Sequence, residues 1–337
     1  MKRKQLILRG LVTFMIVSLM GAGVLYYVYL QMINSVTNDD SNQPQVEDKI
    51  SVVEERMDPF ILLLYGIDER PELHDAGRPD TLMLALVDPE QVKVSLISIP
   101  RDSYVQIPGR KNKEKINHAY PLGGHELTIQ TIEEWLGVSI YGHVAIDFNG
   151  FKELVDLVGG VDVYVDRSII YDAYSDGTHI RLSKGQQVLD GKNALDFVRA
   201  RLDNRGPRYY TSDYQRMERQ QMVLKELGNK LLSFQSLMKI FEIQKIMGDN
   251  ISTSLTAKEL DKLIRTFVSF NMSNLETTSI QGNALRLGGV WYEDVPEEEI
   301  ERIQTLIGSF LDRHATLADE REKQPESDSD EKSNNNG

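Results

Sequence analysis

The sequence predicts a mixed α/β fold, in which one domain is built on a central mixed β-sheet flanked by helices and follows one N-terminal transmembrane helix. Several short runs are apolar at nearly every position, which is typical of strands buried on both faces. Amphipathic helical patterns separate these runs, as expected where helices cover a sheet. Near the N-terminus, 24 consecutive residues (10–33) carry no charge.

The uncharged segment 10–33 predicts a signal anchor that is not cleaved. As a helix it would be roughly 36 Å long, at about 1.5 Å per residue, which is enough to cross a bilayer core of about 30 Å. Basic residues lie only on its N-terminal side, so residues 1–9 are expected in the cytoplasm and the rest of the chain outside the cell membrane. A cleaved signal peptide is the alternative, but its apolar core is normally shorter and ends in small residues.

Two polar segments bound the predicted domain. Residues 34–57 are polar and acidic, which suits a stalk between the membrane and the domain. Residues 316–337 are charged and almost free of apolar side chains, so they are expected to form a disordered acidic tail. The folded part is therefore about residues 58–315.

The expected strands come early in this folded part. The run FILLLYGI predicts a strand at 60–67, TLMLALV predicts one at 81–87, and VKVSLISI predicts one at 92–99. Two further strands are expected at 142–148 and 160–165. Since several of these runs are apolar on both faces, we expect a sheet that is covered on both sides.

Helices are expected between and after these strands. The pattern at 149–160 has Asn149 as its expected N-cap and Gly159 as its expected stop. Residues 250–312 are expected to include two more strands. The remaining helices are predicted at 126–137, 190–201, 212–247 with a break near Ser233, 256–270 and 296–312.

Composition excludes several classes of function. The chain has 51 acidic and 38 basic residues and a net charge of −13, which argues against nucleic acid as a main partner. It has no cysteine, so disulfides, thiolate catalysis and cysteine-ligated zinc are excluded. Its six histidines have no metal-binding spacing.

Arginines concentrate in one segment of this acidic chain. Six of them, and no lysine, fall between positions 199 and 219. A planar guanidinium can hold two oxygens of a phosphate or carboxylate at once, so this composition suits an anion site. The alternative is a solvated helix face on which Asp203, Asp213 and Glu218 form local ion pairs.

Carboxylates and further arginines lie at the ends of the predicted strands. Asp68 follows the first strand and Asp80 precedes the second, so the two carboxylates should lie at one edge of the sheet if these strands are neighbours. Two carboxylates completed by phosphate oxygens and water make an ordinary magnesium site. Arg70 and Arg78 lie in the same segment, and the pair Arg101 and Asp102 ends the third strand. This set of residues predicts phosphoryl or pyrophosphate chemistry.

The order of the motifs resembles the LytR-CpsA-Psr family of bacterial cell-wall proteins. The motifs are GIDER, RPDTLML, ISIPRDSYVQIPG, KINHAY, GGVDVYV, LDGKNALDFVRAR and DYQRMERQQ, over residues 59–232. The resemblance implies a mixed sheet flanked by helices and action outside the membrane. It further implies magnesium-assisted transfer of an anionic glycopolymer, such as wall teichoic acid, from an undecaprenyl pyrophosphate carrier to peptidoglycan.

The resemblance also implies roles for single residues. Asp68 and Asp80 match the magnesium-binding carboxylates of the family, and Arg101 matches a pyrophosphate-binding arginine. Its other head-group ligands are matched by Arg199, Arg201, Arg219 and either Gln215 or Gln220. With Arg70 and Arg78 these form the predicted pyrophosphate-binding set.

The predicted catalytic residues are Arg101, Asp102, Arg199 and Arg201. For the general base, Asp68, Asp80 and Asp102 all remain candidates, and Asp102 could instead only orient Arg101.

A prenyl tail would also need an apolar groove. We expect the apolar faces of helices 212–233 and 234–247 to provide it, with Met217, Met222, Leu224, Leu227, Leu231, Phe234, Leu237, Met238 and Phe241. Ordinary core packing is the alternative reading of these side chains. Two other functions also remain open, namely a membrane-anchored lipid-pyrophosphate phosphatase and a non-catalytic regulator or scaffold of the cell envelope.

Overall fold

The computed structural model describes residues 58–67, 77–173, 178–233, 240–267 and 270–322. The predicted anchor (10–33) and stalk (34–57) lie outside these residues. Within the described ranges, no helix combines the length and the apolar character needed to span a bilayer.

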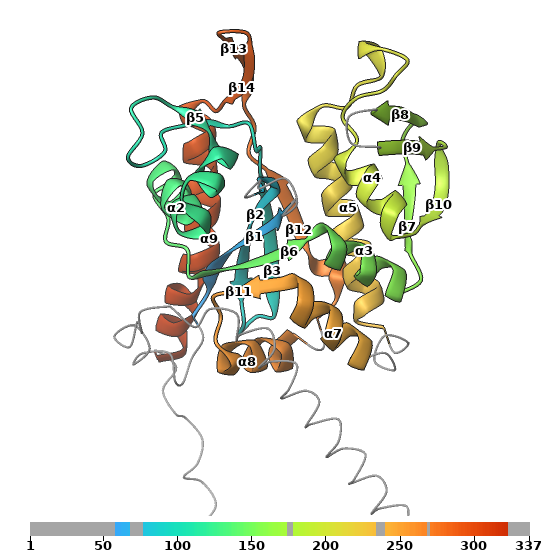
Figure 1. The fold of residues 1–337 in the computed structure, drawn as a ribbon. Coiled ribbons are helices and arrows are strands. Elements are labelled where there is room, and N and C mark those ends of the chain that lie inside the picture. Colours follow the sequence, from blue (N-terminus) through green and yellow to red (C-terminus); the bar gives the residue numbers. More distant parts are fainter. Residues whose placement is uncertain (1–57, 68–76, 174–177, 234–239, 268–269, 323–337) are drawn as a thin grey trace, which may run out of the picture.

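A six-stranded mixed sheet forms the centre of the molecule (Figure 1). Its strands, in spatial order, are β11 (Ile251–Thr253), β6 (Gly142–Asp147), β1 (Phe60–Ile67), β2 (Pro79–Asp88), β3 (Lys93–Ile99) and β12 (Glu276–Ser279). β1 pairs antiparallel with β2 and parallel with β6, while β3 pairs antiparallel with β2 and parallel with β12. The predicted mixed sheet is therefore confirmed, and β1 has the predicted bounds.

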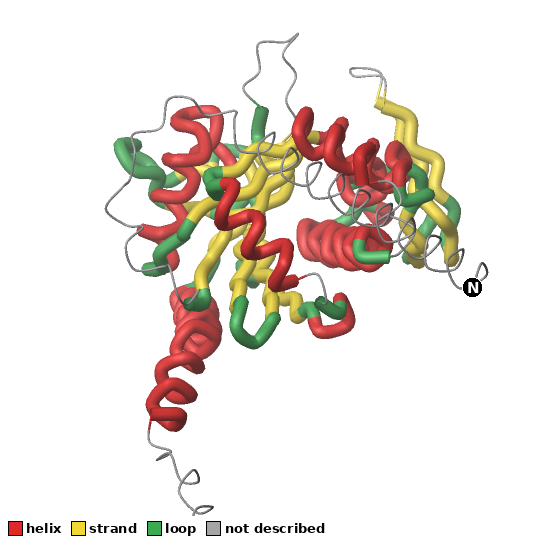
Figure 2. Tube along the Cα trace, turned by 90° about the horizontal axis from the view of Figure 1, so that it is seen from below, coloured by secondary structure: helices red, strands yellow, loops and turns green. Residues whose placement is uncertain are grey.

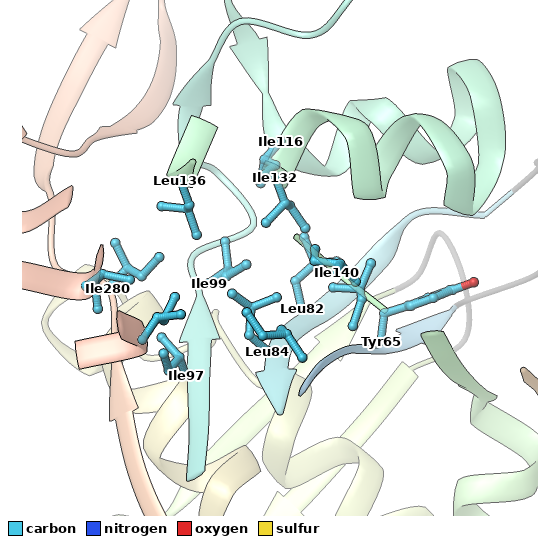
Figure 3. Close-up of a cluster of buried hydrophobic side chains, with 14 of the residues drawn as sticks. Tyr65, Leu82, Leu84, Ile97, Ile99, Ile116, Ile132, Leu136, Ile140 and Ile280 are labelled. Carbon is cyan, nitrogen blue, oxygen red and sulfur yellow. The ribbon is translucent and has the colours of Figure 1, made fainter. Parts of the chain in front are cut away.

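Alternating side chains of β2 explain why its residues 82–87 are all apolar. Leu82 and Leu84 belong to a core on one face of the sheet, as Figure 3 shows. Met83 and Ala85 belong to a second core on the other face. Because successive strand residues point to opposite faces, a strand between two cores needs apolar residues at every position.

Helices cover both faces. α2 (Ala119–Leu136) and α9 (Glu297–Glu322) pack on the first core, where Ile132 and Leu136 are fully buried. α8 (Ala257–Phe267) contributes to the second core. α9 runs into the segment 316–337, which the sequence predicts to be a disordered tail.

A second group of elements lies beside the sheet, where Figure 2 shows small strands apart from the central yellow layer. It has its own core, which includes the fully buried Phe197. α4 approaches α3 closely at Gly191, where an added Cβ would lie 2.2 Å from the carbonyl oxygen of Lys152. The elements are α3 (Phe148–Leu157), β7 (Val161–Val165), β8 (Ile169–Ala173), β9 (Thr178–Leu182), β10 (Gly185–Leu189), α4 (Gly191–Arg199), α5 (Asp213–Leu231) and α7 (Ile240–Asn250).

The N-cap of α3 differs from the prediction. The sequence predicts Asn149, but the helix begins at Phe148, and the carboxylate of Asp147 accepts a 2.7 Å hydrogen bond from the backbone N–H of Gly150. Asp147 also ends β6, so one residue closes the strand and caps the helix. The predicted break in 212–247 is confirmed, because α5 ends at Leu231 and α7 begins at Ile240.

Short pairs of strands complete the fold. β4 (Tyr104–Val105) pairs with β5 (Glu114–Lys115), and β13 (Asn283–Leu287) forms a hairpin with β14 (Val290–Asp294). Within 250–312 the structure therefore has more strands than the two predicted from the sequence, because β11 and β12 join the central sheet there.

Three strands of the sheet end at the same edge. Ile67, the last residue of β1, pairs with Pro79 at the start of β2, and Leu82 of β2 pairs with Ile99 at the end of β3. β6 ends there too, since Asp147 pairs with Ile67. The expectation that the first strands are neighbours is confirmed, and Asp80 near the start of β2 and Arg101 after β3 therefore meet at this edge.

Candidate functional site

Asp80 is the carboxylate at the centre of this edge. It lies near the start of β2, and its Oδ1 accepts a hydrogen bond from Nη1 of Arg101, which follows β3. Its Oδ2 lies 3.8 Å from Nε of Arg199, at the end of α4. The Nε of Arg101 is buried and has no hydrogen-bond partner among the described residues. Arg101 thus retains a donor that an anionic ligand could use.

Asp102 pairs with different residues. Its Oδ1 accepts a 2.8 Å hydrogen bond from Nζ of Lys115, and its Oδ2 lies 3.6 Å from Nη1 of Arg201. The hypothesis that the Asp102 side chain orients Arg101 is therefore wrong for this structure, in which the partner of Arg101 is Asp80. Asp102 instead links the β5 lysine to the segment after α4.

Arg199 and Arg201 reach the site because α4 ends between them. Asp190 caps this helix by accepting a hydrogen bond from Asn193, and the helix stops at Arg199 before the extended Ala200. The guanidinium of Arg199 lies 4.4 Å from the centre of the Phe148 ring. Both predicted arginines are therefore brought together with Asp80 and Asp102.

Arg216 belongs to this group although the sequence analysis did not select it. It is 5% exposed, its Nη2 pairs with Asp213, and its Nε has no partner among the described residues. Burial lowers its pKa, and the nearby positive charges of Arg101 and Arg201 lower it further. The sequence does contain an indication of Arg216. It lies four residues before the predicted ligand Gln220, so the two share one helix face.

Arg219 and Gln215 make other contacts in the described part of the chain. Arg219 donates to Oδ1 of Asp166 from Nε (3.1 Å) and Nη2 (2.7 Å), and it lies over the ring of Phe197. Gln215 accepts a 2.6 Å hydrogen bond from Arg167 and takes part in the capping box of α5. The structure does not bring these two predicted ligands together with Asp80.

Four predicted site residues remain, Asp68, Arg70, Arg78 and Gln220. Asp68 and Arg70 lie outside the described residues. Arg78 is exposed and lies two positions before Asp80. Gln220 lines the cavity described next, together with Asp80.

An apolar cavity of about 290 Å³ opens beside the arginines. It lies between the sheet and helices α3, α4 and α5, and Asp80, Arg199 and Gln220 are part of its lining. Its apolar lining includes Leu64, Met83, Val144, Phe151, Leu195, Val223, Leu224, Leu227 and Leu231. A charged head group and an apolar tail of one ligand could therefore occupy adjoining spaces.

The cavity differs in part from the predicted groove. Leu224, Leu227 and Leu231 line it as expected, whereas Met217 is buried elsewhere and Met222 is 41% exposed. Phe234, Leu237 and Met238 lie outside the described residues, as does the side chain of Phe241. The sheet and helices α3 and α4 provide the remaining walls, which helix periodicity alone did not predict.

Of the two predicted magnesium ligands, the structure describes Asp80. Asp80 supplies hard carboxylate oxygens, which is the donor type that magnesium prefers. Among the described residues, no group of three or more histidine, aspartate or glutamate side chains could hold a metal ion. The second predicted ligand, Asp68, lies outside those residues. Of the two predicted ligands, only the Asp80 carboxylate is therefore shown to be of the chemical type that magnesium prefers.

Known proteins resemble this chain over most of its length. A model of the LytR_cpsA_psr family matches residues 25–308. A protein of Oceanobacillus iheyensis named polyisoprenyl-teichoic acid–peptidoglycan teichoic acid transferase TagU is 35% identical over 310 residues, covering 88% of this chain and 92% of the relative. The protein of the same name in Bacillus subtilis is 29% identical, covering 93% of this chain and 98% of the relative.

Solved structures agree with these sequence matches. The crystal structure of B. subtilis TagV has a TM-score of 0.63 and 31% identity, and the match covers 76% of this chain and 98% of that one. A structure of TagT bound to LI-WTA has a TM-score of 0.59 and 27% identity, and the match covers 75% of this chain and 91% of that one.

Proposed function

This chain belongs to the LytR_cpsA_psr family, and from that premise we propose that it transfers an anionic glycopolymer from an undecaprenyl pyrophosphate carrier to peptidoglycan. Its relatives are named polyisoprenyl-teichoic acid–peptidoglycan teichoic acid transferases, and the chain is a transferase of this kind. Wall teichoic acid is the cargo that these names favour.

The observation that carries the proposal is the junction of an apolar cavity with a cluster of arginines. The cavity is lined almost entirely by apolar side chains, yet Asp80 and Arg199 stand in its wall, and Arg101 contacts Asp80. Burying a prenyl tail removes apolar surface from water at about 25 cal/mol per Å². A lipid pyrophosphate needs both the apolar cavity and the arginine cluster, whereas a soluble phosphate ester needs only the arginine cluster.

The reaction joins the glycopolymer phosphate to a hydroxyl of the acceptor sugar. The hydroxyl oxygen forms a bond to the phosphorus nearest the glycopolymer, and the bond from that phosphorus to the prenyl phosphate breaks. The hydroxyl proton passes to a carboxylate of the site, for which Asp68, Asp80 and Asp102 are candidates. Arg101, Arg199, Arg201 and Arg216 balance the negative charge that develops on the leaving prenyl phosphate.

Magnesium is part of this proposal, with Asp80 and Asp68 as its protein ligands. A bound magnesium ion would neutralise charge on the pyrophosphate oxygens. Removing divalent ions with a chelator should abolish transfer, and adding magnesium back should restore it. Full activity in the chelator would contradict the assignment.

The proposed location is the outer face of the cell membrane. Residues 10–33 would anchor the chain, with residues 1–9 in the cytoplasm and the domain outside. A protease added to intact protoplasts should then digest the domain. Protection of the domain in intact protoplasts would contradict this orientation.

One reconstituted reaction tests the function. The full chain in detergent is mixed with a prenyl-pyrophosphate-linked oligosaccharide, magnesium and peptidoglycan, and covalent attachment of the oligosaccharide is measured. We expect attachment with release of prenyl phosphate. Release of free phosphosugar without attachment would indicate a phosphatase instead, and donor binding without turnover would indicate a regulator or scaffold.

A further inference from the structure

A second cleft borders the site on the side of Asp102 and Arg201. It has a cavity volume of about 430 Å³ and lies between the start of α5 and the β13–β14 hairpin. β12 runs parallel to β3, with Ser279 beside Ser98, so the chain that follows β12 reaches the edge where the arginines lie. The lining residues are Asp102, Arg201, Thr211, Ser212, Asp213, Tyr214, Gly282, Asn283, Ala284, Trp291, Tyr292 and Glu293.

Two aromatic side chains of β14 line this cleft. Trp291 is 52% exposed, and the guanidinium of Arg286 lies 5.4 Å from the centre of its ring. Tyr292 is held from outside the hairpin, since its ring lies 4.8 Å from that of Tyr104 and 5.6 Å from Nζ of Lys115. Successive strand residues point to opposite faces, so the exposed indole of Trp291 alone is the aromatic surface on which the C–H face of a sugar ring can stack.

The wall of the cleft is fixed by a hydrogen-bond network. The Tyr214 hydroxyl donates to Glu293 and accepts a 2.6 Å hydrogen bond from the backbone N–H of Gly282. The backbone N–H of Glu293 donates to the carbonyl oxygen of Asp102 (2.9 Å). These bonds tie α5, the hairpin and the arginine site into one unit, so the cleft has a fixed position relative to Asp102.

The charge of the cleft differs from that of the arginine cluster. Asp102, Asp213 and Glu293 line it together with the single guanidinium of Arg201. Burial raises the pKa of Glu293, and the charges of Asp213 and Asp102 raise it further. Carboxylates repel a polyanionic donor polymer but can accept hydrogen bonds from the hydroxyl and amide groups of a sugar without phosphate.

We propose that this cleft binds the acceptor glycan, an N-acetylated sugar strand of peptidoglycan, with Trp291 as the stacking platform. This inference rests on the proposed transferase function. Asp102 and Arg201 belong to both the cleft and the pyrophosphate site, so a hydroxyl of a sugar in the cleft would lie next to the donor phosphate. Holding both reactants in this way makes the reaction effectively unimolecular.

The test substitutes Trp291→Ala in the full chain and measures two constants separately. One is the KM for uncross-linked peptidoglycan glycan strands, and the other is the Kd of the prenyl-pyrophosphate-linked oligosaccharide. We expect the acceptor KM to rise about tenfold, since a stacked aromatic face is lost. The donor Kd should stay within about twofold of wild type.

Two variants control for disturbance of the hairpin. Trp291→Phe keeps an aromatic face and should restore most of the acceptor affinity. Val290→Ala changes an exposed neighbour on the same strand, 45% exposed and outside the cleft, and should leave both constants unchanged. An effect of Val290→Ala equal to that of Trp291→Ala would overturn the stacking role.

Other outcomes separate this inference from the proposed function. An acceptor KM for Trp291→Ala equal to that of wild type overturns the inference, and so does a loss of donor affinity instead of acceptor affinity. Direct binding of the glycan strands to the full chain, measured without donor, tests the cleft independently. If the wild type binds strands through Trp291 but forms no product, the proposed transfer fails and the cleft assignment stands.

Discussion

The arginines of the site and those of the neighbouring framework differ in how their charges are satisfied. The site arginines, Arg101, Arg199, Arg201 and Arg216, are grouped around Asp80 and Asp102, and two of them have a buried Nε without a partner among the described residues. The framework arginines, Arg205 and Arg219, direct several donors at one carboxylate each. Arg205 donates to Asp203 from Nε (2.8 Å), Nη2 (2.7 Å) and its backbone N–H (2.9 Å).

This difference distinguishes arginines that can bind a ligand from arginines that stabilise the fold. An arginine whose donors are all used by protein oxygens stabilises the fold and has little left for a ligand. Burial is the main cause of the lowered pKa of Arg216, and the positive charges of Arg101 and Arg201 lower it further, so an incoming pyrophosphate would offset their repulsion. Loss of a site arginine should therefore affect transfer, while loss of a framework pair should affect the free energy of unfolding.

The largest effect is expected for Arg101→Ala. Its guanidinium contacts Asp80, and its Nε has no partner among the described residues, so its loss would remove a proposed ligand of the charged phosphates. We expect kcat/KM for transfer to fall by about 10² to 10³. The melting temperature should change little, because Arg101 lies at the sheet edge and outside the apolar cores. A variant that folds normally and transfers at the wild-type rate would remove Arg101 from the site.

Arg216→Met should weaken donor binding and also lower stability. A charge-assisted hydrogen bond contributes about 1.5–3 kcal/mol, so the Kd of a prenyl pyrophosphate should rise roughly tenfold to a hundredfold. Methionine of similar length removes the partner of Asp213, whose side chain is largely buried, so the Asp213 carboxylate loses its ion pair and the melting temperature should fall. Titration and thermal unfolding of the same sample give both values. Lower stability with wild-type affinity would place Arg216 in the framework.

Asp203→Asn should lower stability and spare transfer. The Asp203 carboxylate is buried and accepts hydrogen bonds from Arg205 and from the backbone N–H of Ile170. Losing this charged partner should lower the free energy of unfolding by about 1–3 kcal/mol at pH 7, measured by urea denaturation. Since Asp203 is not a site residue, kcat/KM should change less than about threefold. A larger loss of activity than of stability would contradict its framework role.

The effect of Asp203→Asn should also depend on pH. The hydrogen bond from the Arg205 side chain, more than any other influence, holds the pKa of Asp203 well below its usual range. The unfolded chain binds this proton near pH 4, so the stabilisation is fully present above about pH 5 and is lost as pH falls toward the native pKa. The stability difference between wild type and Asp203→Asn should therefore be constant from pH 7 to about pH 5 and shrink below about pH 4. A difference that grows on acidification would contradict the pairing.

Arg208→Ala should have the smallest effect. Arg208 is exposed, and its guanidinium lies 4.8 Å from the ring centre of Tyr209. Surface substitutions of this kind change stability by less than about 0.5 kcal/mol, and transfer should be unchanged. An activity loss as large as that of Arg101→Ala would show that the site is not confined to the four site arginines.

The sequence predicts the sheet better than the side-chain pairing. Strand 60–67 is predicted with its observed bounds because its apolar run is continuous and begins and ends with the strand. Asn149 was expected as a cap because Asx residues cap helices, but Asp147 does so because strand β6 ends there. Whether Asp80 or Asp102 holds Arg101 depends on the relative placement of three strand ends, which no local pattern contains.

The arginine cluster illustrates the same limit. A count of six between 199 and 219 predicts an anion site but does not say which arginines face it. Arg219 pairs with Asp166. Arg216 pairs with Asp213 and lies near enough to Arg101 and Arg201 for their charges to lower its pKa, and only the packing of α5 decides this. Helix periodicity predicts which residues share a face, and tertiary contacts determine what that face meets.

The most direct test of the central claim is a titration of the full chain with a short-tailed prenyl pyrophosphate, followed by phosphorus NMR. Wild type and Arg208→Ala should give the same saturable shift of the pyrophosphate signals, and Arg101→Ala and Arg216→Met should give a much weaker one. A prenyl alcohol without phosphate should compete only weakly for the cavity. Equal shifts in all four proteins would contradict the claim that the site arginines hold a lipid pyrophosphate at the mouth of the apolar cavity.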